Sequence, residues 1–223
     1  MKNNGEVNEK IKRHPLAVII THWLIAISVF MLFFSGLGQM PLYRRYFLTN
    51  VPGFAWTDQY LITINIHYIA AFVFIVAIFF HMVYHSMRRE FSIVPRKGDV
   101  VESILIIKAM FGKGTEPPSE KFLAEQRLAY LFIGINLLVL IITGMIKTAK
   151  NLATTELPYS LTVMATTVHN IATVLLLFGV IAHLGAFVVK SNRPLFLSMF
   201  TGKVDKEYAQ ERHSKWFQRG TNN

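Results

Sequence analysis

Four histidines lie in strongly apolar stretches of the chain, where ionisable side chains are rare and usually mark a functional path. His169 and His183 are fourteen residues apart on one expected helix, so they lie within about 40° of each other on one face and about 21 Å apart along it. His22 and His67 belong to earlier apolar stretches and could meet this pair across a bundle. A low-spin haem takes two neutral imidazoles, so the pattern predicts two bis-histidine haems.

The composition indicates that the lipid bilayer is the solvent of most of the chain. Hydrophobic residues make up 52% of it and charged residues 16%, which is too apolar for an ordinary soluble domain. We expect a single all-α domain over residues 1–223, a four-helix transmembrane bundle that encloses two b-type haems. The first stretch is interpreted as a retained helix, because it is too long for a signal peptide. The four expected membrane-spanning helices cover residues 16–37, 61–85, 129–146 and 163–189.

The basic residues predict the orientation of these helices. Of 23 Lys and Arg residues, all but Arg44, Arg45, Lys147 and Lys150 lie in the N-terminal tail, in the segment between the second and third helices, or in the C-terminal tail. By the positive-inside rule, both termini are expected in the cytoplasm. Topology and contact with anionic membrane lipid account for the net charge of +10, and no nucleic-acid partner is expected.

Two kinds of residue are absent from the sequence or from its expected spans, and each absence excludes or disfavours a class of site. The chain has no cysteine, which excludes structural disulfides, thiolate-bound iron–sulfur clusters and covalent attachment of a c-type haem. No Asp or Glu occurs in the four expected spans, whereas a histidine-lined metal or proton transporter, the alternative from a different class, is expected to use membrane carboxylates or broken helices.

Depth divides the membrane histidines into two levels. His22 and His183 are each seven residues from a cytoplasmic boundary, whereas His67 and His169 are near the external face. His81 complicates the inner level, because it is fourteen residues after His67 and matches the depth of His183 as well as His22 does. Periodicity alone leaves both pairings open.

Other residues near these levels have expected roles. Gly36 and Gly144 are expected at the outer haem, where each leaves a gap for the porphyrin or else only lets helices pack closely. His85 is expected at the interface, and His14 and His213, outside the spans, are expected in solvent. An amphipathic segment over residues 99–111, with Asp99 as helix cap, is expected along the membrane surface. The basic tail, residues 190–223, could dock on a partner or on lipid headgroups.

Several short motifs together resemble a known family. They are Thr21-His22-Trp23, Ser35-Gly36, Ile66-His67, Thr143-Gly144, Val168-His169, Ala182-His183, Gly202-Lys203-Val204 and His213-Ser214-Lys215-Trp216-Phe217. Over nearly the whole chain they resemble the gamma subunit, a dihaem cytochrome b, of membrane-bound respiratory formate dehydrogenases. That family is closely related to the cytochrome b subunits of hydrogenases.

The resemblance implies how the histidines pair and what the chain does. His67 and His169 would bind the iron of the outer haem, and His22 and His183 that of the inner haem; His81 has no counterpart in the family. Electrons from an external iron–sulfur subunit, fed by a molybdenum or tungsten catalytic subunit, would pass through both haems to menaquinone or ubiquinone near the cytoplasmic face. The chain would be a multi-pass protein of the bacterial inner membrane. The alternative is the same subunit of a nickel–iron hydrogenase or another periplasmic dehydrogenase.

The resemblance also implies a quinone pocket near the start of the third helix. The stretch Lys121-Phe122-Leu123-Ala124-Glu125-Gln126 is similar to a family stretch that reads K-Y-N-A-G-Q. This chain has Leu123 in place of the asparagine and Glu125 in place of the glycine, whereas Gln126 matches. Two roles for Glu125 are open: it handles protons, or it is a solvated interfacial carboxylate.

Overall fold

The computed structural model describes residues 9–40, 48–110, 112–152 and 156–221. The chain is mostly helical and forms two compact units, one of residues 15–89 and the other of residues 1–14 and 90–223. Four helices, α1, α3, α5 and α6, are long and apolar enough to cross a membrane. Each of these helices overlaps one of the four apolar stretches expected from the sequence.

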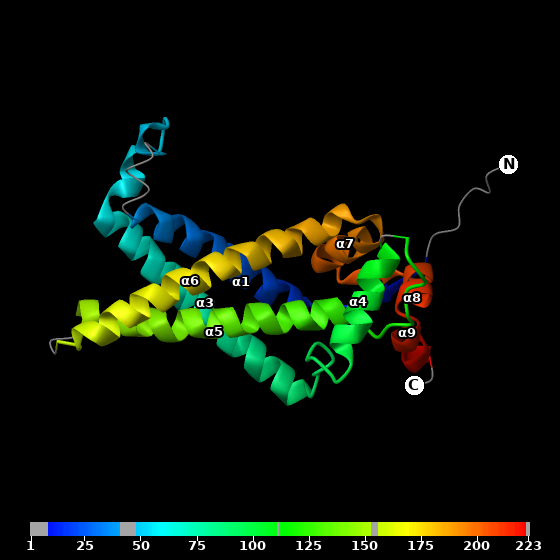
Figure 1. Ribbon diagram of the computed structural model, residues 1–223. Coiled ribbons are helices and arrows are strands. Elements are labelled where there is room, and N and C mark those ends of the chain that lie inside the picture. The colour runs from blue at the N-terminus through cyan, green and yellow to red at the C-terminus, as the bar shows by residue number, and fades with distance from the viewer. Residues whose placement is uncertain (1–8, 41–47, 111, 153–155, 222–223) are drawn as a thin grey trace. The chain divides into compact units, whose positions relative to one another are not determined.

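The unit of residues 15–89 is built on two helices that pack along each other, α1 (Leu16–Gly38) and α3 (Tyr60–Arg88) (Figure 1). Two short 3₁₀ turns, η1 (Leu48–Asn50) and η2 (Ala55–Asp58), precede α3. Gly38 permits the close contact at the end of α1, because a Cβ there would lie 2.5 Å from the carbonyl oxygen of Thr57. The same Cβ would lie 2.9 Å from Cγ2 of Thr63, so the small residue lets the end of α1 approach both η2 and the start of α3.

The other unit contains α5 (Ala124–Leu152) and α6 (Tyr159–Gly185), which lie side by side (Figure 1). Helix α6 continues through the 3₁₀ turns η3 (Ala186–Val188) and η4 (Lys190–Asn192). A Cβ on Gly179 would lie 3.0 Å from the ring of Phe132, so glycine permits a close approach of the two helices. Because α5 leads into α6 through a short connection, the first turn of α5 and the last turn of α6 lie at the same end of this pair.

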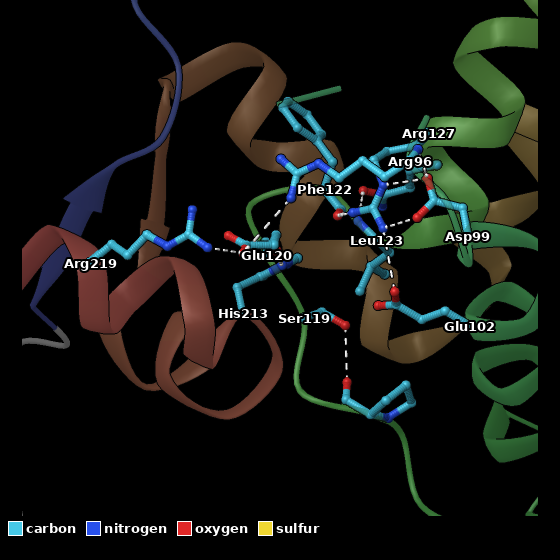
Figure 2. Close-up of polar contacts among 12 residues, drawn as sticks. Arg96, Asp99, Glu102, Ser119, Glu120, Phe122, Leu123, Arg127, His213 and Arg219 are labelled. Atoms are coloured by element: carbon cyan, nitrogen blue, oxygen red, sulfur yellow. Dashed lines mark hydrogen bonds and ion pairs between the residues drawn. The ribbon is translucent and has the colours of Figure 1, made fainter. Parts of the chain in front are cut away.

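An ion pair buried beside the start of α5 explains why that helix begins five residues before the expected stretch. Arg127 Nε and Nη2 donate to the two carboxylate oxygens of Asp99 at 2.8 and 2.6 Å, and both side chains are only 3% exposed (Figure 2). Asp99 is the first residue of α4 (Asp99–Met110), so the pair holds α4 against α5. The hydrogen bonds from Arg127 lower the pKa of Asp99. Instead of capping its own helix, this carboxylate neutralises a cation on the next one.

The tail after α6 folds back onto other parts of the same unit. It forms α7 (Arg193–Thr201), strand β2 (Lys203–Asp205), α8 (Lys206–Arg212) and α9 (Ser214–Thr221). Strand β2 pairs in antiparallel fashion with β1 (Lys10–Lys12), with Ile11 opposite Val204. We call residues 9–14, 116–123 and 190–221 the terminal cap, because the two ends of the chain meet there.

The expectation that His14 and His213 are solvated is wrong. His14 is 8% exposed and His213 is fully buried in the terminal cap. The backbone amide of His14 donates to the carbonyl of Gly202 at 3.0 Å, and Nδ1 of His213 lies 2.7 Å from the carbonyl oxygen of Glu120. Arg13 is 3% exposed and lies over the rings of Phe122 and Trp216. Both histidines lie outside the apolar spans, so the sequence gives no sign that they are buried. Their burial follows from the contact between the two ends of the chain.

Burial in the terminal cap also changes the basicity of these groups. It lowers the pKa of His213 to about 4, and the nearby charge of Arg13 adds to the effect. Burial likewise lowers the pKa of Arg13 to about 10. The folded cap therefore holds His213 in its neutral form, with Nδ1 as the donor to Glu120.

We predict that the cap loses stability in mild acid. Because the pKa of His213 falls from 6.5 to about 4 on folding, its contribution is present above pH 6.5 and is lost as the pH falls towards about 4. The loss reaches about 3 kcal/mol at the acid end, and His213→Gln removes this titration. Thermal unfolding in detergent, followed by tryptophan fluorescence over this pH window, measures it. An equal pH dependence in the two proteins would contradict the prediction.

Candidate functional site

His67 lies in the second turn of α3, and the last turns of α1 supply its neighbours. Its Nδ1 is 2.9 Å from the hydroxyl of Ser35, a fully buried side chain. The same hydroxyl donates to the carbonyl of Met31 at 2.7 Å. A Cβ on the next residue, Gly36, would lie 3.6 Å from Cε1 of the imidazole. A hydroxyl and a glycine therefore bound one side of the His67 ring.

His169 on α6 has the same surroundings, provided this time by α5. Its Nδ1 is 2.9 Å from the hydroxyl of Thr143, and that hydroxyl donates to the carbonyl of Val139 at 2.7 Å. A Cβ on Gly144 would lie 3.5 Å from Cε1 of the ring. Each compact unit thus contains one histidine held by a hydroxyl–glycine pair on the neighbouring helix.

These hydrogen bonds select one tautomer of each imidazole. Because the hydroxyls of Ser35 and Thr143 donate to backbone carbonyls, they accept from the histidines, and the Nδ1 atoms carry the proton. The lone pair of each ring is then on Nε2. This is the form in which a neutral histidine ligates iron, with its other nitrogen oriented by a hydrogen bond.

The structure brings Gly36 and Gly144 against histidine rings. At 3.6 and 3.5 Å, a Cβ at either position would make an ordinary contact with the imidazole edge. The sequence predicts a gap for a porphyrin at each of these glycines. In the structure, each glycine lies beside a histidine that is expected to bind haem.

The inner level contains two neighbouring candidates on α1 and α3. His22 and His81 are within electrostatic range of each other in the unit of residues 15–89. The rings of His81 and His85 are 4.5 Å apart, and the ring of His22 meets that of Trp23 edge to face at 5.5 Å. Their proximity leaves both His22 and His81 as possible ligands, as their spacing in the sequence does.

His183 lies in the last turn of α6, at one end of a row of aromatic rings. Its ring meets that of Phe187 edge to face at 5.7 Å, and Phe187 meets Phe196 at 5.1 Å. Phe196 in turn contacts Phe200 at 5.3 Å. This row connects the expected inner ligand to α7 and orients its ring through apolar contacts.

The three residues of the expected quinone pocket differ in how they are held. Leu123 is fully buried and packs with Ile106 and Ala124. Its amide donates to Oε1 of Gln126 at 3.2 Å, so Gln126 caps the start of α5. Oε2 of Glu125 is buried and has no hydrogen-bond partner among the described residues. One oxygen of Glu125 is therefore buried, although the residue as a whole is half-buried.

The two basic residues near Glu125 in this stretch, Lys121 and Arg127, have different surroundings. Burial, helped by the charge of Arg13, lowers the pKa of Lys121, whose backbone carbonyl accepts a hydrogen bond from the Arg13 guanidinium. Arg127, two residues after Glu125, is already engaged by Asp99. Of the residues expected in the quinone pocket, Glu125 is the one with a buried side-chain oxygen that has no hydrogen-bond partner among the described residues.

Sequence reasoning missed the roles of Ser35 and Thr143. The signal was present, because each is a small hydroxyl residue directly before a glycine near the end of an apolar stretch. Both pairs contributed to the resemblance as motifs, but the assignment of their hydroxyls to His67 and His169 needs the helix pairing that the structure supplies.

Known proteins are similar to this chain over most of its length. It is 25% identical over 215 residues to the formate dehydrogenase cytochrome b556 subunit of Haemophilus influenzae, covering 93% of this chain and 82% of that protein. It is 24% identical over 198 residues to the cytochrome b556(Fdn) subunit of the nitrate-inducible formate dehydrogenase of Escherichia coli K12, covering 88% of this chain and 85% of that protein.

The region that matches a known family contains the four long helices described above. The four long apolar helices indicate a multi-pass bacterial membrane protein. The model of the family described as prokaryotic cytochrome b561 matches residues 13–202, which include every membrane histidine discussed here. The chain belongs to the prokaryotic cytochrome b561 family.

Proposed function

We propose that this chain is the membrane-anchoring, dihaem cytochrome b subunit of a respiratory formate dehydrogenase in the bacterial inner membrane. Membership of a cytochrome b family implies haem b, and two similar proteins are named as cytochrome b556 subunits of formate dehydrogenases. The chain would carry electrons from an external iron–sulfur subunit to menaquinone, or to ubiquinone, near the cytoplasmic face. A molybdenum or tungsten subunit would oxidise formate outside.

The observation that carries this proposal is the matched hydrogen bond at His67 and His169. In each case a helix hydroxyl fixes the Nδ1-protonated tautomer, so that Nε2 is the ligand atom. We assign these two histidines to the outer haem, and His22 and His183 to the inner one. When bound, each haem supplies an iron that accepts and releases one electron at a time.

The other residues of the proposed haem sites hold the ligands in position and shield them from water. Ser35 and Thr143 keep the two outer imidazoles in one orientation, and Gly36 and Gly144 leave room beside them. The long apolar helices keep water away from the ligands. The chain has no cysteine, so haem would be retained by ligation and packing alone.

The proposed direction of electron transfer follows from orientation. The basic tails and the basic segment before α5 favour cytoplasmic termini by the positive-inside rule. The start of α5, with Leu123, Glu125 and Gln126, would then face the cytoplasmic side, as would His183 at the end of α6. We assign the quinone site to this end of the α5–α6 pair.

Purification of the native complex from membranes tests the proposed function. We expect partner subunits with iron–sulfur clusters and molybdenum or tungsten, two acid-acetone-extractable haems per chain in the pyridine haemochrome assay, and reduction of those haems by formate. Copurification with a nickel–iron hydrogenase, and haem reduction by hydrogen instead of formate, would overturn the formate assignment. Clearly less than one haem per chain in a fully loaded preparation would overturn the cytochrome assignment.

Substitutions at the outer site test the role of the hydroxyls. His67→Ala and His169→Ala should each remove the outer haem. Ser35→Ala and Thr143→Val should keep the ligands but lower haem affinity by about tenfold to hundredfold, because the orienting hydrogen bond is lost. Haem titration of the apoprotein and redox potentiometry measure both effects. Thr162→Val is the matched control, since that hydroxyl bonds to Pro158 of its own helix. Equal haem affinity in all three hydroxyl variants would contradict the assigned role.

A second set of variants decides between His22 and His81. If His22 and His183 are the inner ligands, His22→Ala and His183→Ala should each convert the inner haem to a high-spin form or lose it. His81→Ala should then keep both low-spin haems. Optical and electron paramagnetic resonance spectra of the reduced and oxidised proteins report the spin state. Loss of the low-spin inner haem in His81→Ala, with His22→Ala unaffected, would transfer the ligand role to His81.

A further inference from the structure

Buried polar atoms without partners gather in the terminal cap and at the start of α5. Among the described residues, Nε and Nη1 of Arg13, Nε2 of His213 and Oε2 of Glu125 are buried and lack a hydrogen-bond partner. Arg13 is 3% exposed and His213 is fully buried. Buried polar groups are nearly always satisfied by protein or by ordered water, so a group of them in one region requires a physical explanation.

These side chains have a common neighbour, Arg212 on α8. Arg212 is 8% exposed, and its Nε donates to Oε1 of Glu116 at 2.9 Å. Its charge interacts with those of Arg13, His213 and Glu125. The unsatisfied atoms therefore belong to side chains within electrostatic range of Arg212, and we call this group of side chains the polar cluster of the compact unit.

The charges of this cluster favour water as its occupant. The cluster contains donors and acceptors side by side, the guanidinium groups of Arg13 and Arg212 and the carboxyl groups of Glu116 and Glu125, so water, which both donates and accepts, can satisfy them. Buried waters typically make about three hydrogen bonds to groups of this kind. Waters among these side chains would satisfy the unpaired nitrogens and the Glu125 oxygen together.

The cluster has one end in solvent and the other on a membrane-spanning helix. The Glu116 side chain is 28% exposed, whereas Glu125 lies in the first turn of α5. The charged groups that face Glu125 are Arg212 from α8, Glu116 from the segment before α5, and Arg127 from its own helix. Because α6 carries His183 in its last turn, Glu125 and His183 lie at the same end of the α5–α6 pair.

We propose that Glu125 is the proton-carrying residue for quinone reduction, and that a hydrated path through the terminal cap resupplies it from Glu116. This inference rests on the proposed function. Reduction of one quinone to quinol consumes two electrons, which the proposed function supplies, and two protons. Protonated Glu125 gives one proton to a quinone oxygen, water in the cluster returns a proton from the cytoplasm to the carboxylate, and Glu125 then gives the second proton in the same way.

Stopped-flow reoxidation of the purified complex tests this role. The haems are reduced with dithionite, which makes the test independent of the electron donor, and a soluble naphthoquinone is then added at several pH values. Glu125→Gln should keep both haems and slow their reoxidation by about tenfold or more, because a positioned proton carrier is lost. Glu125→Asp should recover most of the rate, and the exposed Glu207→Gln is the matched control. Reoxidation of Glu125→Gln at the normal rate, with an unchanged pH profile, would overturn the inference.

Two further measurements separate the possible outcomes. Infrared difference spectra of the wild-type complex on quinone reduction should contain a carboxyl band that Glu125→Gln lacks, and an unchanged band would overturn the inference. If Glu125→Gln does not assemble, the Glu116→Gln variant tests the path. Because this variant removes the carboxyl group at the solvent end of the proposed path, haem reoxidation should slow. Reoxidation at the normal rate would overturn the path. Failure of the wild-type haems to reoxidise with any quinone would overturn the proposed function itself.

Discussion

A hydrogen bond from imidazole Nδ1 to a helix hydroxyl is the contact on which the candidate site depends. In membrane helices such a bond stabilises by roughly 0.6 kcal/mol on average, which is little beside the packing of a whole helix. Its importance is that it selects the tautomer of the histidine. By accepting from Nδ1, the hydroxyls of Ser35 and Thr143 determine which nitrogen of His67 and His169 carries the lone pair, and so which one would bind the iron of the proposed haem.

The same contact occurs once in each compact unit, on different local sequences. In one unit Ser35 of α1 serves His67 of α3, and in the other Thr143 of α5 serves His169 of α6. Both hydroxyls are satisfied within their own helix by the carbonyl four residues earlier, at 2.7 Å in each case. A backbone carbonyl of one helix thus fixes the hydroxyl, and the hydroxyl orients the histidine of the neighbouring helix. Neither histidine needs a charged residue to hold it.

Sequence patterns predicted the four apolar spans well, because length, hydropathy and helical spacing are local properties. They predicted the start of α5 poorly, since Arg127 looks like a cytoplasmic residue until its ion pair with Asp99 is seen. They also placed His14 and His213 in solvent, although both are buried where the two ends of the chain meet. Contacts between segments about two hundred residues apart leave no periodic signal, which is why the terminal cap was beyond prediction.

The meeting of the two ends has a consequence for biosynthesis. Strand β1 pairs with β2, and the guanidinium of Arg13 lies over Trp216, so these groups are enclosed by residues made about two hundred positions later. Until the ribosome has made β2 and Trp216, Arg13 lacks the second of its two aromatic rings and Ile11 has no strand partner. A chain truncated before β2 would keep all four apolar helices and yet leave the terminal cap unfinished.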